Sequence, residues 1–227
     1  MPFLTQFGFD NYTFTGDIAA FALCTIMAIL INTSYVPRTR SFRIFQSVTA
    51  NIALAAVVNI AYHVLVNEFL MQMVVLVYIL RVVYQVLLFD TLFLFALYIT
   101  EVTEMERKRA RFVAIFASVI FFLTIALDIA CTISGCGFRI TENGITTDRA
   151  NIYILGYLIF VIFLVILMMR VHHLLYRRVM FGFYGTMIIA IALRLGQMAF
   201  KMSSFTTVSF VFPASPCCIS CTPIRTT

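Results

Sequence analysis

Polar and ionisable side chains stand inside the long apolar stretches of this sequence, where they are the residues that could do chemistry. They come from four such stretches and are Asn59, His63, Arg81, Gln85, Asp128, Arg194 and Gln197. Guanidinium groups beside amides can hold a small anion, such as a carboxylate, through paired hydrogen bonds. The alternative is structural: Asp128 neutralises one arginine, the amides satisfy the remaining donors, and the cluster fixes helix packing.

Patterns typical of enzymes and metal sites are missing from the sequence. It has no glycine-rich phosphate loop, nucleophile elbow or HExxH motif. His172 and His173 are adjacent and would point about 100° apart on a helix, which suits a metal poorly. Cys218 and Cys221 have the CxxC spacing but no second pair. We therefore expect no catalytic residues, no metal and no cofactor.

Composition indicates what must position these side chains. Hydrophobic residues make up 62% of the 227 and charged residues 11%, with a mean hydropathy of +1.00. Soluble domains carry about 25% charged residues, so the sequence indicates an integral membrane protein. The net charge of +6 does not indicate a nucleic-acid partner, because the basic residues cluster beside apolar runs.

We expect an all-α integral membrane protein with six complete transmembrane helices and a seventh that begins and is cut short. The expected spans are 17–33, 45–66, 69–99, 112–131, 152–169 and 179–200, with 205–213 opening the seventh. Residues 1–16 are then an extracytoplasmic segment, 17–213 the helical bundle, and 214–227 a tail rich in Cys and Pro.

Two connections have patterns of their own. Residues 101–111 are expected to continue the third helix into the cytoplasm, with Glu104 and Lys108 paired at i,i+4. Residues 138–147 alternate around Asn143-Gly144, which predicts a β-hairpin with a two-residue loop.

Lysine and arginine counts predict the orientation. The first–second connection holds three basic residues, the third–fourth four and the fifth–sixth three. The N-terminal segment and the second–third connection hold none, the fourth–fifth two and the sixth–seventh one. By the positive-inside rule the N-terminus lies outside. The seven polar residues named above then lie in the outer half to the middle of the membrane.

Other polar residues have simpler interpretations. Asp90, nine residues after Arg81, should lie toward the cytoplasm and pair with Arg170 or with basic residues of the loops. Cys131 and Cys136 could form a disulfide on the outer side in an oxidising compartment, or Cys131 could be buried in lipid.

Short motifs carry a family resemblance. They are FTGDI at 14–18, Tyr62-His63 ending the second helix, Arg81 in the third, and SFTTVSFVFP at 204–213. With these, residues 8–213 resemble the seven-helix input modules that precede diguanylate cyclase (GGDEF-type) domains in bacterial signalling proteins. No GGDEF signature occurs in the chain, so the resemblance implies an input module without cyclase activity of its own.

The tail has a separate hypothesis. One codon series for 214–227, read in another frame, encodes an apolar helix that resembles the family's own ending. We hypothesise that the tail is a frameshift product and that a catalytic domain was lost downstream, which sequencing of the locus past Thr227 tests.

Two classes of function follow. The first is a sensory input module of the bacterial cytoplasmic membrane, which binds a small anionic ligand from outside and relays to a cyclase domain. The second is a small transporter or channel, which needs polar groups reaching both faces. The outer half is polar on several helices while the inner half has mainly Asp90, which favours the sensor. Its expected partners are the lipid bilayer, the ligand, and a second copy or intact family relatives.

Overall fold

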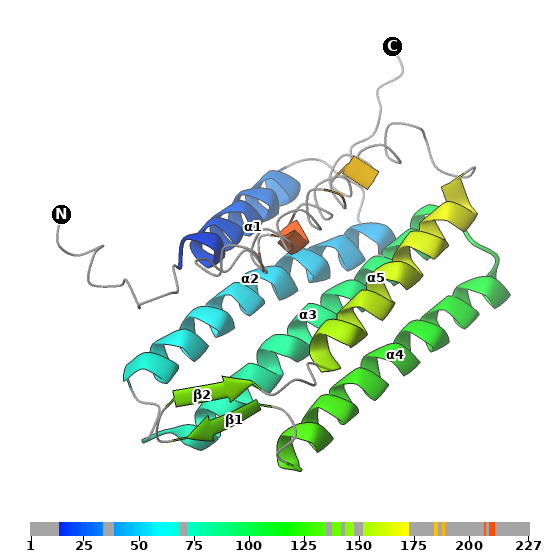
Figure 1. The fold of residues 1–227 in the computed structure, drawn as a ribbon. Helices are drawn as coiled ribbons and strands as arrows, with labels where there is room; N and C mark the ends of the chain where they lie inside the picture. Colours follow the sequence, from blue (N-terminus) through cyan, green and yellow to red (C-terminus); the bar gives the residue numbers. More distant parts are fainter. Residues whose placement is uncertain are drawn as a thin grey trace. The chain divides into compact units, whose positions relative to one another are not determined.

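The computed structural model describes residues 14–33, 39–68, 72–134, 138–141, 144–147, 152–172, 184–185, 188, 207 and 209–211. Within them the chain is mainly helical (Figure 1). The elements are α1 Thr15–Thr33, α2 Arg40–Glu68, α3 Val74–Val102, α4 Arg107–Ile133, β1 Phe138–Thr141, β2 Gly144–Thr147 and α5 Ile152–Val171. The first five expected helices are therefore confirmed in order, although the third begins at Val74 and not at 69. Most of the expected sixth and seventh spans lies outside the described residues.

Three of the described helices are long and apolar enough to cross a membrane: α2, α3 and α4. They contain 29, 29 and 27 residues, or about 40–44 Å at 1.5 Å per residue. A bilayer core is about 30 Å thick, so each can cross it with a turn or more to spare at the ends. Shorter apolar helices occupy Thr15–Leu30 and Leu155–Val171.

The chain divides into two compact units. One contains Met1–Ile60 and His173–Thr227, and the other contains Ala61–His172, so α2 passes from the first into the second. In the second unit α3, α4 and α5 pack against one another. Aromatic residues help fill this three-helix core: Phe89 and Phe160 are fully buried, and their rings lie 6.3 Å apart. The exposed ring of Phe116 on α4 lies 5.0 Å from that of Phe163 on α5.

A glycine allows α4 and α5 to approach closely. Gly156 of α5 lies directly against Thr124 of α4, and a Cβ at position 156 would overlap the threonine side chain. Small residues at such contacts are how membrane helices gain packing contacts without a hydrophobic driving force between them.

A tight turn joins α3 to α4, so the expected helical extension over 101–111 is wrong. The helix α3 ends at Val102, and the amide of Met105 donates to the carbonyl of Thr100 across the turn. Glu104 has a φ of 46°, in the left-handed region that ends helices. Because the helix stops there, the predicted i,i+4 geometry of Glu104 and Lys108 does not exist. An exposed Arg109–Glu106 contact of 3.8 Å lies in the first turn of α4 instead.

The predicted β-hairpin is confirmed, with a different loop. Phe138 pairs with Thr147 and Thr141 with Gly144, so Gly144 belongs to the second strand and not to the loop, where the Asn-Gly pattern places it. Glycine is favoured both inside a two-residue hairpin loop and at the residue after a type I turn, so the same letters fit both registers.

Hydrogen bonds at both ends hold α1 beside α2 in the first unit. Asn59 donates to Asp17 over 2.9 Å, and Gln46 donates to Asn32 over 3.2 Å. The two pairs are 15 residues apart on α1 and 13 apart on α2 and run in opposite order, so the helices are antiparallel. The α2 N-terminus is capped by the hydroxyl of Thr39, which accepts a hydrogen bond from the Phe42 amide.

Candidate functional site

Arg81 and Asp128 lie at the same height of the α3–α4 pair. Arg81 is 21 residues before the last residue of α3, Val102, and Asp128 is 21 residues after the first residue of α4, Arg107. Since the helices are antiparallel and joined by a short turn, equal distances along them put the two side chains level, about 32 Å from the turn. The turn therefore sets the register that brings this cation and this anion together.

The two side chains form a bidentate ion pair. Arg81 Nη2 donates to Asp128 Oδ1 over 3.0 Å, and Arg81 Nη1 donates to Asp128 Oδ2 over 3.1 Å. Their side chains are 14% and 10% exposed. Parallel hydrogen bonds of this kind are the strongest that a guanidinium group makes with a carboxylate, because both donors and both acceptors are aligned.

Gln85 and Thr132 surround the pair. In the orientation that gives both the nitrogen and the oxygen of its amide a partner, Gln85 bridges the pair. Its nitrogen donates to Asp128 Oδ2 over 2.7 Å, and its oxygen accepts from Arg81 Nη2 over 3.2 Å. The Thr132 hydroxyl accepts from Arg81 Nη1 over 3.3 Å and lies 2.8 Å from the carbonyl oxygen of Asp128. We call these four residues, Arg81, Gln85, Asp128 and Thr132, the Arg81 cluster. Sequence reasoning grouped the first three and missed Thr132, which stands one turn after Asp128 on the same face of α4.

The electrostatics of the Arg81 cluster are balanced. One positive and one negative group are fully hydrogen-bonded to each other inside a packed helix pair, which lowers the cost of placing charge at membrane depth. The Asp128 carboxylate occupies the Nη1–Nη2 edge of the guanidinium group. An anion can therefore bind Arg81 at that edge only by replacing Asp128.

Asn59, expected near Arg81, has different partners. Its amide donates to Asp17 Oδ2 over 2.9 Å, and the Thr207 hydroxyl donates to Asp17 Oδ1 over 2.6 Å. All three residues are buried, with Asp17 and Thr207 0% exposed. We call them the Asp17 cluster. Asp17 stands in the first turn of α1, where the positive end of the helix dipole favours a carboxylate.

Sequence reasoning did not assign Asp17 or Thr207 to a site, although a signal was present. Asp17 lies in the FTGDI motif and Thr207 in the SFTTVSFVFP motif, the first and last segments that carry the family resemblance. The structure joins these two segments by one hydrogen bond between residues 190 positions apart.

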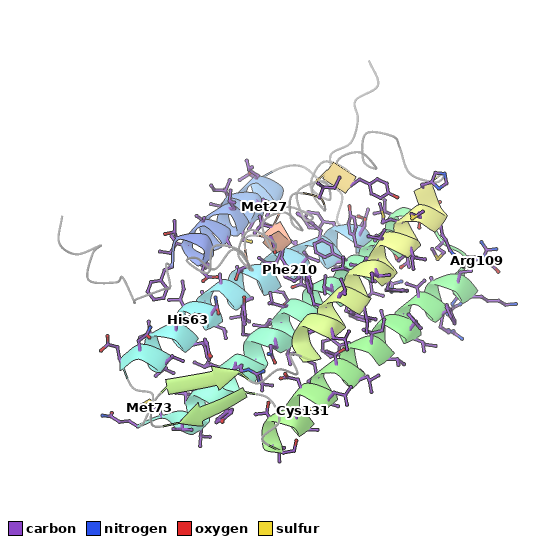
Figure 2. The ribbon with its side chains drawn as sticks, in the orientation of Figure 1. Met27, His63, Met73, Arg109, Cys131 and Phe210 are labelled. Carbon is purple, nitrogen blue, oxygen red and sulfur yellow. The ribbon has the colours of Figure 1, made fainter. Side chains whose placement is uncertain are left out.

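The remaining predicted site residues divide into two groups. His63, labelled on α2 in Figure 2, is half-buried. Its ring meets that of Tyr62 edge-on, with centroids 5.0 Å apart. Arg194 and Gln197 lie outside the described residues.

Three other predictions concern polar residues away from these clusters. Asp90 is half-buried on α3. His172 Nδ1 lies 2.6 Å from the carbonyl oxygen of Met169, and His173 is outside the described residues. Cys131, near the end of α4 (Figure 2), is a free thiol, so the disulfide alternative is not what the structure contains. Among the described residues no group of three or more His, Cys, Asp or Glu side chains could hold a metal ion.

Comparison with known proteins identifies no relative. No family model matches the chain, and no curated protein or solved structure matches it either. The functional argument therefore depends on the geometry of the chain itself.

Proposed function

We propose that this chain is a sensory input module of the bacterial cytoplasmic membrane, which binds a small anionic ligand from outside. In this proposal the chain has six complete membrane spans and the beginning of a seventh, and its N-terminus lies outside. A change in helix packing would be relayed to a cytoplasmic output domain of the diguanylate cyclase type, which these 227 residues do not contain. The observation that carries it is the buried Arg81–Asp128 pair inside membrane-length helices. Ionisable residues at such positions are costly and usually functional.

The depth of the Arg81 cluster supports access from outside. The turn between α3 and α4 is followed by Arg107, Lys108, Arg109 and Arg111, all exposed and at the cytoplasmic side by the positive-inside rule. In Figure 2, Arg109 lies near one end of α4 and Cys131 near the other. The Arg81–Asp128 pair is about 32 Å from the turn, and a bilayer core is about 30 Å thick. The pair therefore lies close to the outer edge of the core, within reach of a soluble anion.

The ion pair supplies a two-state element, which a sensor needs. In one state Asp128 occupies the Arg81 guanidinium group and links α4 to α3. In the other a ligand carboxylate takes that place, and Asp128 turns to water or takes up a proton. A ligand can shift helix packing only by its difference in affinity for the two states. Here that difference arises because the Nη1–Nη2 edge of the guanidinium group cannot hold both carboxylates at once.

Ligand-dependent stability tests this function directly. The purified chain is melted in detergent micelles, followed by far-UV circular dichroism, with acetate, succinate or inorganic phosphate as probes and chloride at equal ionic strength as reference. At least one probe should raise the melting temperature, and Asp128→Asn should strengthen that shift, because the competing carboxylate is gone. Arg81→Ala should abolish it.

Arg109→Ala is the matched control, since it removes the same charge from a side chain that is 79% exposed. A shift retained in Arg81→Ala, or lost equally in Arg109→Ala, refutes the anion site. Net uptake of a labelled probe into proteoliposomes would refute the sensor and indicate a transporter.

A further inference from the structure

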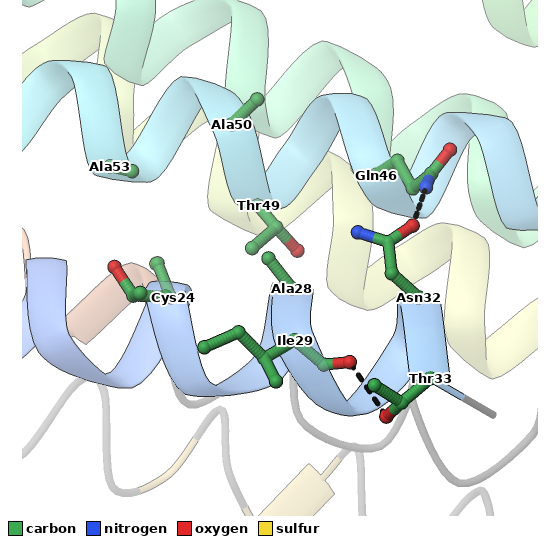
Figure 3. Close-up of a pocket in the computed structure, with 10 residues that line it drawn as sticks. Cys24, Ala28, Ile29, Asn32, Thr33, Gln46, Thr49, Ala50 and Ala53 are labelled. Atoms are coloured by element: carbon green, nitrogen blue, oxygen red, sulfur yellow. Dashed lines mark hydrogen bonds between the residues drawn. The ribbon is translucent and has the colours of Figure 1, made fainter.

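A groove runs between α1 and α2 in the first unit. Its walls are Cys24, Thr25, Ala28, Ile29, Asn32 and Thr33 of α1 and Gln46, Thr49, Ala50 and Ala53 of α2, and it encloses about 560 Å³. Figure 3 shows the two helices side by side, with Thr49 of α2 directed toward Ala28 of α1. We call it the α1–α2 groove.

The groove exists because hydrogen bonds join the two helices near their ends, and small side chains line the space between these bonds. Asn59–Asp17 joins the helices beyond the Cys24–Ala53 end of the groove, and Gln46–Asn32 joins them at its other end. Between them, Ala50 and Ala53 on α2 provide only methyl groups. A void next to lipid does not stay empty when an alkyl chain can enter it, because filling it recovers dispersion contacts.

Polarity changes along the groove from one end to the other. At one end the Asn32 amide nitrogen points along the groove toward Ala28 (Figure 3), while its oxygen accepts from Gln46. The other end is lined by Cys24, which is 1% exposed, by Ala53, and by Thr25, whose hydroxyl donates to the Phe21 carbonyl of its own helix. From Asn32 to Cys24 is eight residues of α1, or about 12 Å. This is close to the thickness of one leaflet of a bilayer core, about 15 Å.

Positive charge lies beside the polar end. Arg40 and Arg43 are both exposed, at the start of α2. Arg43 is three residues before Gln46 and seven before Ala50, so it shares their face of the helix. Because α2 is long enough to cross the membrane, its first turns lie at a membrane surface, where basic residues attract anionic lipid headgroups.

We propose that the α1–α2 groove is a binding site for an anionic phospholipid. One acyl chain lies between Ala28 and Ala50, the Asn32 amide donates to an ester or phosphate oxygen, and Arg40 and Arg43 neutralise the headgroup. A second copy of the chain fits this surface less well. A symmetric dimer through the groove would bring the arginines of both copies to the same depth, where they repel. The site is independent of the anion-binding function proposed for Arg81.

Photo-crosslinking tests the lipid site. The chain is reconstituted in nanodiscs of phosphatidylcholine containing a phosphatidylglycerol with a photoreactive acyl chain, and labelled peptides are located by mass spectrometry. Labelling should fall on the groove-lining residues of α1 and α2. Ala50→Leu fills the groove and should lower that labelling at least tenfold. Ala22→Leu adds the same side chain at an exposed position of α1 outside the groove and should leave it unchanged.

A second pair of variants keeps the test valid if Ala50→Leu does not fold. Arg40→Gln and Arg43→Gln change exposed side chains, and together they should remove the preference for photoreactive phosphatidylglycerol over photoreactive phosphatidylcholine. Equal labelling of Ala50→Leu and wild type overturns the site, as does a headgroup preference that survives both arginine changes. Dimers seen by native mass spectrometry that disappear in Ala50→Leu would assign the groove to a second copy and overturn the lipid proposal.

Discussion

Removing Arg81 should destabilise the protein more than removing both charges of its pair. Arg81→Met leaves the Asp128 carboxylate, which is 10% exposed in the intact pair, without its cation. Breaking a buried ion pair from one side costs about 3–5 kcal/mol of unfolding free energy, because one charge stays buried without compensation. The double variant Arg81→Met/Asp128→Leu leaves no charge behind, so its cost should be about 1 kcal/mol or less.

Equilibrium unfolding measures this difference. Wild type, both single variants and the double variant are titrated with dodecyl sulfate in mixed micelles and followed by far-UV circular dichroism. The four free energies form a double-mutant cycle. A double variant no more stable than Arg81→Met would refute the pairing. A cost below about 1 kcal/mol for Arg81→Met would show that Asp128 does not depend on this cation.

The surface ion pair of α4 provides the control for that cycle. Arg109 and Glu106 lie 3.8 Å apart with side chains 79% and 63% exposed. Exposed pairs contribute little, because water and salt screen them. Arg109→Met should therefore leave the unfolding free energy within about 0.5 kcal/mol of wild type. A larger loss would mean that any arginine removal destabilises the protein in micelles.

Three further changes have defined outcomes in the same assay. Gly156→Ala should cost about 1–3 kcal/mol by overpacking against Thr124, and Thr124→Ala in the same chain should recover part of it; additive losses would contradict the close contact. Glu104→Gly should stabilise the protein by about 0.5–1 kcal/mol, since glycine adopts a φ of 46° without strain; a loss of stability would contradict that backbone conformation. Asn59→Leu should cost about 1–3 kcal/mol by removing a buried donor to Asp17, and no loss would mean that the hydrogen bond is unimportant.

The helices were predictable because apolar runs of sufficient length must be helical in a membrane, where every backbone polar group needs an internal partner. Their ends were less predictable. The helix α2 begins at Arg40, five residues before the predicted start at 45, because Thr39 caps it outside the apolar run. Hydropathy marks the part of a helix that fits the bilayer, whereas capping groups decide where the helix begins.

The turn between α3 and α4 could not be located from the sequence. Residues 103–106 contain neither glycine nor proline, the residues that usually mark a helix end. The structure ends α3 by placing Glu104 in the left-handed region, a conformation that its side chain does not favour. With the turn unknown, the level positions of Arg81 and Asp128 could be estimated only roughly.

The candidate site was predicted only in part, because the sequence indicates the depth of a residue but not which helices are neighbours. Depth alone correctly placed Arg81, Gln85 and Asp128 together, because two of them share a face of α3 and the third is level with them. Depth also grouped Asn59 with them, although its amide donates to Asp17. Residues at one depth can face different neighbours around a bundle, and only the helix arrangement distinguishes them.

In both units polar pairs fix how two antiparallel helices align. The space between the helices is filled in one unit and remains open in the other. The antiparallel helices α3 and α4 are closed by a turn at one end and by Arg81–Asp128 near the other, and large buried residues such as Phe89 and Phe95 fill the core that they form with α5. The antiparallel helices α1 and α2 are also joined at both ends, but small side chains lie between them and a groove remains. Hydrogen bonds and ion pairs set the register of each helix pair, and side-chain volume then decides whether the space between is core or binding site. On this reasoning, filling the α1–α2 groove with Ala50→Leu should leave the Arg81–Asp128 coupling energy unchanged, whereas Gly156→Ala, which disturbs α4 directly, should reduce it.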